Sequence, residues 1–245
     1  MKQLLEGIMS ALKQNPTDKQ IYLDLLEISK GNDISVPFIR QSKEILLENL
    51  TEGLLDVARL IDIRLGRETF LDFLNAIEID REYNSTFWIR RKNILEGKHK
   101  IASTLNEFIE APAKDKYFLS MSYAAGIGKS ALLSFIAAYI MGKNHYARNF
   151  YVGYTAKLPN MTFERVKGII DPLGEYNFKD IFYDFPFDAV VYDNKELTIR
   201  IDTKGISQAR AKKNDHIFSF VSVDGSITGV TRAGGDLKTV QGSVC

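Results

Sequence analysis

The strongest constraint on the fold of this chain is a change in the spacing of its apolar residues near residue 110. Before that point apolar residues recur three or four positions apart, which is the spacing of one helix face. Stripes of this kind include Leu4, Leu5, Ile8 and Leu12, then Phe70, Leu71, Leu74 and Ile77. We therefore predict that residues 1–110 form a helical domain, in which a last helix runs over residues 86–109.

Two local signals mark helix starts within this helical half. Thr17 is followed by Gln20 at the spacing of a capping box, in which the two side chains bind each other's backbone N–H groups. Ser35 precedes Pro37, and proline is favoured in a first helical turn because its missing N–H has no partner there anyway. One helix is thus expected to begin close to Thr17 and another close to Ser35.

From residue 111 onward, short apolar runs alternate with turns and helical segments, which is an α/β pattern. Strands are expected over residues 117–121, 149–154 and 216–223, with a hairpin over residues 189–201. We predict a second domain over residues 111–245, joined to the first without a flexible linker.

Composition narrows the class of protein further. The chain has 245 residues, of which 45% are hydrophobic and 26% charged, as in a folded soluble protein. The formal net charge of +1 gives no global attraction to nucleic acid. Cys245 is the single cysteine, which excludes an internal disulfide and a cysteine-based zinc site. No apolar run is long enough to span a membrane, so we expect a cytoplasmic location, in the host cell if a phage encodes the chain.

A phosphate-binding loop is the sharpest chemical signal in the sequence. An apolar run at 117–121 leads through a loop to an apolar helix, the order in which backbone N–H groups and a helix N-terminus surround phosphate oxygens. We predict that this loop binds a nucleotide through Ala125, Gly126, Ile127, Gly128, Lys129 and Ser130. Lys129 would contact the β- and γ-phosphates, and the Ser130 hydroxyl would be a ligand of Mg²⁺.

The loop departs from the strict phosphate-loop pattern at one position, because Tyr123 stands where the first glycine is expected. The alternative is an ordinary strand-to-helix turn that contains Gly-Lys-Ser. The order of strand, loop and helix favours the nucleotide-binding interpretation.

Three segments in order resemble the ATPase domain of phage terminase large subunits, the motors that package DNA. They are the runs 120–130, 150–157 and 218–232, the last of which contains the turn Gly225-Ser226-Ile227-Thr228-Gly229. The resemblance covers about residues 83–237. It implies a three-layer α/β domain of the P-loop type that binds ATP and Mg²⁺. Double-stranded DNA, a small terminase subunit and a portal are the implied partners, with no membrane.

The resemblance also suggests two further functional residues. Arg91 lies in an aromatic and basic run, 88–92, similar to a segment that can contact adenine in these motors. Thr155 follows a strand, at a position similar to the hydroxyl thought to couple nucleotide state to DNA. A solvated basic helix face is the alternative for Arg91, and a plain strand-end cap is the alternative for Thr155.

The chain departs from this family after Arg232. ATP hydrolysis of this type needs an apolar strand that ends in acidic residues, one to hold Mg²⁺ and one to orient water. Residues 233–245 contain no such strand, and Asp236 precedes any strand rather than closing one. We expect an incomplete P-loop fold with little ATP turnover by this chain alone and no nuclease activity, and a partner chain could complete the fold.

Two other functions fit parts of the sequence. One is a different P-loop NTPase, such as a helicase-like protein. The other is a non-enzymatic module in which the helical half binds a partner and the α/β half is a degenerate scaffold. The turn at Gly225–Gly229 favours the terminase over the helicase, and nucleotide binding would separate both from the scaffold.

Overall fold

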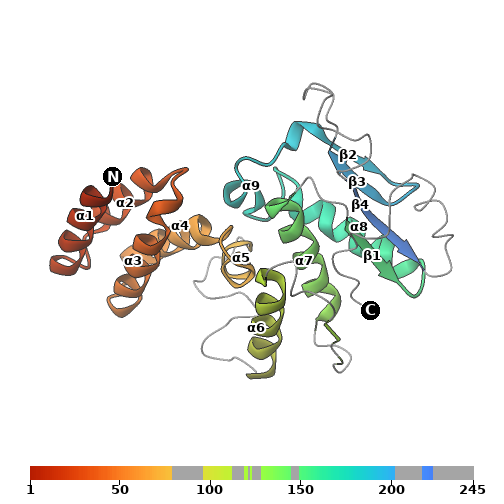
Figure 1. Ribbon diagram of the computed structural model, residues 1–245, viewed down its shortest axis with the longest axis horizontal. Coiled ribbons are helices and arrows are strands. Elements are labelled where there is room, and N and C mark those ends of the chain that lie inside the picture. The colour runs from red at the N-terminus through yellow and green to blue at the C-terminus, as the bar shows by residue number, and fades with distance from the viewer. Residues whose placement is uncertain are drawn as a thin grey trace. The chain divides into compact units, whose positions relative to one another are not determined.

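The computed structural model describes residues 1–78, 96–111, 119–120, 122, 128–144, 149–201 and 217–222. The chain divides into two compact units, Met1–Glu110 and Ala111–Cys245. Helices and a small mixed sheet make up the described residues, so the protein has a mixed α/β fold, as predicted (Figure 1). Among these residues, no helix is both long and apolar enough to cross a membrane.

The first unit is built from helices. They are α1 (Lys2–Gln14), α2 (Lys19–Ser29), α3 (Val36–Glu48), α4 (Leu55–Leu65), α5 (Phe70–Ala76) and α6 (Glu96–Glu110), with the 3-10 helices η1 (Asp33–Ser35) and η2 (Glu52–Leu54). The apolar stripes of α1 to α4 meet in one core that includes Leu5, Tyr22, Ile39 and Ile61. Burial of these stripes supplies the main stabilising term for such amphipathic helices. The predicted helix 86–109 corresponds to α6, and residues 86–95 lie outside the described residues.

The start of α2 differs from the predicted capping box. Asp18 is the N-cap, and its carboxylate accepts a hydrogen bond from the backbone N–H of Gln20 at 2.9 Å. The assignment of Thr17 as the cap was therefore wrong, because the adjacent aspartate reaches the same helix end and also carries a negative charge that the helix N-terminus favours. At α3 the prediction is confirmed, since Ser35 is the N-cap and Pro37 lies in the first turn.

Side chains of α3 and α6 bind the first turn of α5. Arg40 of α3 donates two hydrogen bonds to Asp72, at 3.2 and 2.6 Å. From α6, Glu110 and Asn106 accept hydrogen bonds from the backbone N–H groups of Phe70 and Leu71, at 3.1 and 3.0 Å. These N–H groups have no partner within their own helix, so α6 caps α5 from outside.

The second unit contains helices and a four-stranded sheet. The helices are α7 (Lys129–Lys143), α8 (Lys157–Ile170) and α9 (Phe178–Ile181), with the 3-10 helix η4 (Phe187–Ala189). The strands are β1 (Asn149–Gly153), β2 (Val190–Asp193), β3 (Thr198–Ile201) and β4 (Ile217–Ser222). They lie in the order β1-β4-β3-β2, in which β1 and β4 are parallel and the other neighbours antiparallel. The predicted strands 149–154 and 216–223 are confirmed as β1 and β4.

The predicted hairpin is confirmed as β2 and β3, and its turn is closed by Asp193. The Asp193 carboxylate accepts hydrogen bonds from the backbone N–H groups of Glu196 at 3.0 Å and Lys195 at 2.9 Å. These two bonds favour the charged carboxylate and lower the pKa of Asp193. Leu197 follows with a φ of +48°, which lets the chain turn back into β3.

Aromatic residues form much of the core of the second unit. Helix α8 packs on β1 and β4 (Figure 1), where the rings of Phe163 and Phe220 meet edge to face with centroids 5.6 Å apart. A second aromatic contact lies at α9, where the ring centroids of Phe178 and of the C-cap residue Phe182 are 5.0 Å apart. The contact between Phe163 and Phe220 holds α8 against the parallel pair of strands.

One predicted strand is not seen in this sheet. Of residues 117–121, only Leu119 and Ser120 are described, and neither belongs to a strand. The other three residues lie outside the described part of the chain. The P-loop strand therefore remains a sequence prediction.

Candidate phosphate-binding site at the start of α7

The predicted phosphate-binding loop meets the described structure at Gly128, the N-cap of α7. Gly128 has a φ of +91° and a ψ of 19°, in the left-handed region. A side chain at this φ would be strained, whereas glycine adopts it readily. The sequence therefore places glycine where the backbone path into α7 requires one.

Lys129 and Ser130 form the beginning of α7, and both are exposed. The carbonyl of Gly128 accepts the first hydrogen bond of the helix, from the N–H of Leu132 at 3.1 Å. The N–H groups that precede Leu132 in the helix have no acceptor within it. The first turn of α7 itself contains no acidic residue, and the N-terminus of a helix carries partial positive charge.

The rest of α7 is buried on nearly every side. Its buried residues are Leu132, Ser134, Phe135, Ile136, Ala137, Ala138, Tyr139, Met141 and Gly142. Near its C-terminus Gly142 packs so closely on Phe182 that an added Cβ would lie 2.4 Å from the ring. The exposed Lys129 and Ser130 thus lie at the N-terminal end of a helix whose middle turns are buried in the core.

Thr155 lies in the short connection between β1 and α8, and it is exposed. Its carbonyl accepts a hydrogen bond from the N–H of Leu158 at 3.2 Å as the chain turns into α8. The turn is tight because Gly153 lacks a side chain: an added Cβ would lie 2.6 Å from Cδ of Pro159. Sequence reasoning missed this contact, although a glycine at a strand end followed by a proline in a helix start is its signal.

The carboxyl ends of the two parallel strands lie side by side. Gly153, the last residue of β1, is paired in register with Ser222, the last residue of β4. In α/β proteins, ligands are commonly bound at the carboxyl ends of parallel strands. Thr155 follows β1 at this edge of the sheet.

The structure describes part of the predicted site. Gly128, Lys129 and Ser130 are consecutive residues at the start of α7, and Thr155 follows β1. Ala125, Gly126, Ile127 and Arg91 lie outside the described residues, as does Asp236. In the described part of the chain, no group of three or more His, Cys, Asp and Glu side chains is placed to hold a metal ion.

Comparisons of this chain with protein-family models, with curated proteins and with solved structures find no match.

Proposed function

We propose that this chain binds a Mg²⁺-nucleotide at the start of α7, as the ATP-binding part of a terminase-like DNA-packaging motor. The observation that carries the proposal is the left-handed Gly128 followed by exposed Lys129 and Ser130 in the first helical turn. These features offer backbone N–H groups, an ammonium and a hydroxyl at one helix end. They are the groups that bind phosphate oxygens and Mg²⁺ in phosphate loops.

Each residue has a separate role in this proposal. The backbone of Ala125 to Ser130 would surround the phosphates, and Gly128 would let the chain turn from the loop into α7. Lys129 would neutralise charge on the β- and γ-phosphates, and the Ser130 hydroxyl would be a ligand of Mg²⁺. Phosphate groups fit this helix end because its first turn carries no carboxylate.

The assignment to a terminase-like motor rests on the order of sequence segments. Two of the segments that resemble terminases, 150–157 and 218–232, contain all but the first residue of β1 and of β4, and these strands are parallel neighbours. This adjacency supports the proposal, because segments of one ATPase domain are expected to lie in one sheet. Double-stranded DNA, a small terminase subunit and a portal are the proposed partners.

The direct test is isothermal titration of the protein with a non-hydrolysable ATP analogue in the presence of Mg²⁺. We expect Lys129→Ala to weaken binding roughly 10- to 100-fold, as for loss of a hydrogen bond to a charged group. Lys143→Ala is the matched control, because Lys143 is an exposed lysine at the opposite end of the same helix. Circular dichroism would show whether both variants are folded. Equal affinities of the wild type and a folded Lys129→Ala variant would contradict the proposal.

A further inference from the structure

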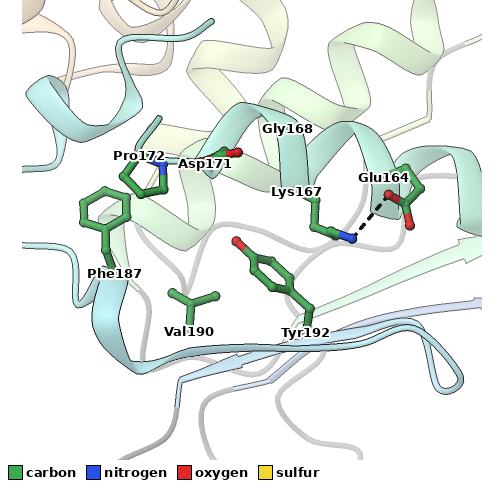
Figure 2. Close-up of a pocket in the computed structure, with 8 residues that line it drawn as sticks. All are labelled: Glu164, Lys167, Gly168, Asp171, Pro172, Phe187, Val190 and Tyr192. Carbon is green, nitrogen blue, oxygen red and sulfur yellow. Dashed lines mark ion pairs between the residues drawn. The ribbon is translucent and has the colours of Figure 1, made fainter. Parts of the chain in front are cut away.

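A pocket of about 390 Å³ opens between α8 and β2, and neither Lys129 nor Ser130 is among its lining residues (Figure 2). Its polar lining comes from Glu164 and Lys167 in the C-terminal half of α8, from Asp171 at the C-cap of that helix, and from Tyr192 of β2. Phe187 and Val190 are among its apolar lining residues. The volume lies within the range of about 300–1,000 Å³ that is usual for small-molecule sites.

The charges around this pocket favour a cation. Lys167 Nζ lies 3.4 Å from Glu164 Oε2, so these two lining residues largely neutralise each other. Asp171 then leaves the lining with a net charge of −1 at neutral pH. Helix α8 ends at Ile170, and the carbonyl groups of a helix C-terminus add partial negative charge. An anionic ligand would be repelled by both features.

Tyr192 offers a surface on which a cation can bind. Lys167 Nζ already lies 5.4 Å from the centroid of the Tyr192 ring, within the distance of a cation–π interaction. Figure 2 shows the Tyr192 side chain reaching from β2 toward α8, with its hydroxyl end on the side of Asp171. Burial, and to a lesser extent the charge of Asp171, raise the pKa of Tyr192, so the hydroxyl stays protonated at neutral pH.

The opposite wall of the pocket is apolar. Phe187 of η4 and Val190, the first residue of β2, lie across from Lys167 in Figure 2. An ammonium or guanidinium group alone would leave this wall in contact with water. A cation carried on a short apolar stem would bury the wall while its charged end met Asp171 and the Tyr192 ring.

We propose that this pocket binds an organic cation, an ammonium or guanidinium group on a short apolar stem. The cation is either a free small molecule or an arginine or lysine side chain of a peptide, since both present the same chemistry. Asp171 supplies the opposite charge, Tyr192 the aromatic face, and Phe187 with Val190 the contact for the stem. This site is independent of the nucleotide-binding site proposed at the start of α7.

The experiment measures binding of matched probes to the full chain by ligand-observed NMR and isothermal titration. Butylammonium and butylguanidinium are the cationic probes, butan-1-ol is their uncharged counterpart and butyrate the anionic one. Acetyl-Gly-Arg-Gly-amide presents the guanidinium as a peptide side chain. We expect the cations to bind and butan-1-ol and butyrate to bind more weakly. Tighter binding of the peptide than of butylguanidinium would assign the site to a protein side chain, and the reverse order to a small molecule.

Conservative variants locate the binding in the pocket. Asp171→Asn removes the charge but keeps an oxygen for the hydrogen bond that Asp171 Oδ1 accepts from the N–H of Leu173 at 2.9 Å. We expect this change to weaken cation binding roughly 2- to 5-fold, as for a partly exposed ion pair. Tyr192→Leu should weaken it by a similar factor through loss of the ring face. Asp180→Asn is the control, because it removes the same charge from exposed Asp180 on α9, which does not line the pocket.

Three results would overturn the proposal. The first is equal binding of butylammonium and butan-1-ol, or tighter binding of butyrate, to the wild-type protein. The second is cation binding that Asp171→Asn leaves unchanged, or that Asp180→Asn weakens as much as Asp171→Asn does. The third is absence of binding by every cationic probe at concentrations of tens of millimolar.

Discussion

Lys43 Nζ lies 2.6 Å from Asp62 Oδ1, and the Asp62 side chain is only 2% exposed. The pair joins α3 to α4 inside the helical unit. Burial raises the pKa of Asp62, and the positive charge of Lys43 acts in the opposite direction. A buried carboxylate of this kind needs an oppositely charged partner to remain ionised at low energetic cost, because its charge has lost most of its hydration.

We therefore predict that Lys43→Met lowers the free energy of unfolding by about 3 kcal/mol at pH 7, the lower end for breaking a buried pair, since Lys43 remains partly exposed. The double variant Lys43→Met with Asp62→Leu should recover most of this loss, because no buried charge remains. Urea unfolding followed by circular dichroism, with hydrogen exchange of α3 and α4 peptides, measures both effects. A double variant as unstable as the single one would show that packing of the lysine stem, rather than charge, is responsible.

The same pair gives this prediction a pH dependence. A carboxyl group whose pKa is higher in the folded than in the unfolded protein costs stability above its unfolded value, and the cost disappears as the pH falls through the folded pKa. Without Lys43 the pKa of Asp62 should rise further. The deficit of Lys43→Met should therefore shrink as the pH is lowered from 7 toward 5.

Gly142 provides a second prediction, on packing in the α/β unit. An added Cβ would lie 2.4 Å from the Phe182 ring, which is itself fully buried. We expect Gly142→Ala to destabilise the unit by about 1–3 kcal/mol, as overpacking of a filled core does. Gly168→Ala is the matched control, because Gly168 is also helical but has open space around its Cβ position. That variant should instead be more stable by about 0.5–1 kcal/mol, and thermal unfolding of both would distinguish the contact from a general effect of alanine.

The third prediction concerns the backbone at Gly128, whose φ is +91°. Gly128→Ala should lower stability by about 1–2 kcal/mol, because an L-residue with a Cβ is strained in the left-handed region. Gly128→Asn should be less destabilising, since asparagine visits this region more readily. Differential scanning calorimetry of the wild type and the two variants measures the order of their stabilities. If the alanine and asparagine variants are equally stable, the left-handed conformation of Gly128 is not the cause of the stability lost on substitution.

The helices and the hairpin were predictable because their signals are local. The apolar stripe at Leu5 and Leu12 and the alternation over β3 depend only on residues close in sequence. The choice of Asp18 over Thr17 as a cap was not predictable in the same way. Both residue types cap helices, and only the path of the backbone decides which carboxyl or hydroxyl oxygen reaches a free N–H.

Contacts between distant segments could not be read from the sequence. Gly142 meets Phe182, and Lys167 meets Tyr192, only because α7, α8 and β2 fold against one another. The start of α7 was foreseen since Gly128-Lys129-Ser130 is a contiguous motif in front of an apolar helix. The pocket beside α8 was not, because its lining is assembled from two separate stretches of the chain with no motif in either.

The burial of α7 along most of its length has a consequence for how occupancy of its exposed end could be detected. A helix held in the core unfolds together with α8, on which it packs, so unfolding of the unit also destroys a ligand site at Lys129 and Ser130. Mass action then links the two equilibria: a ligand at 100 times its dissociation constant adds about 2.7 kcal/mol to the stability of the folded state. The melting temperature of the α/β unit would rise with the logarithm of ligand concentration. A thermal unfolding curve would therefore report ligand binding at this helix end without any label.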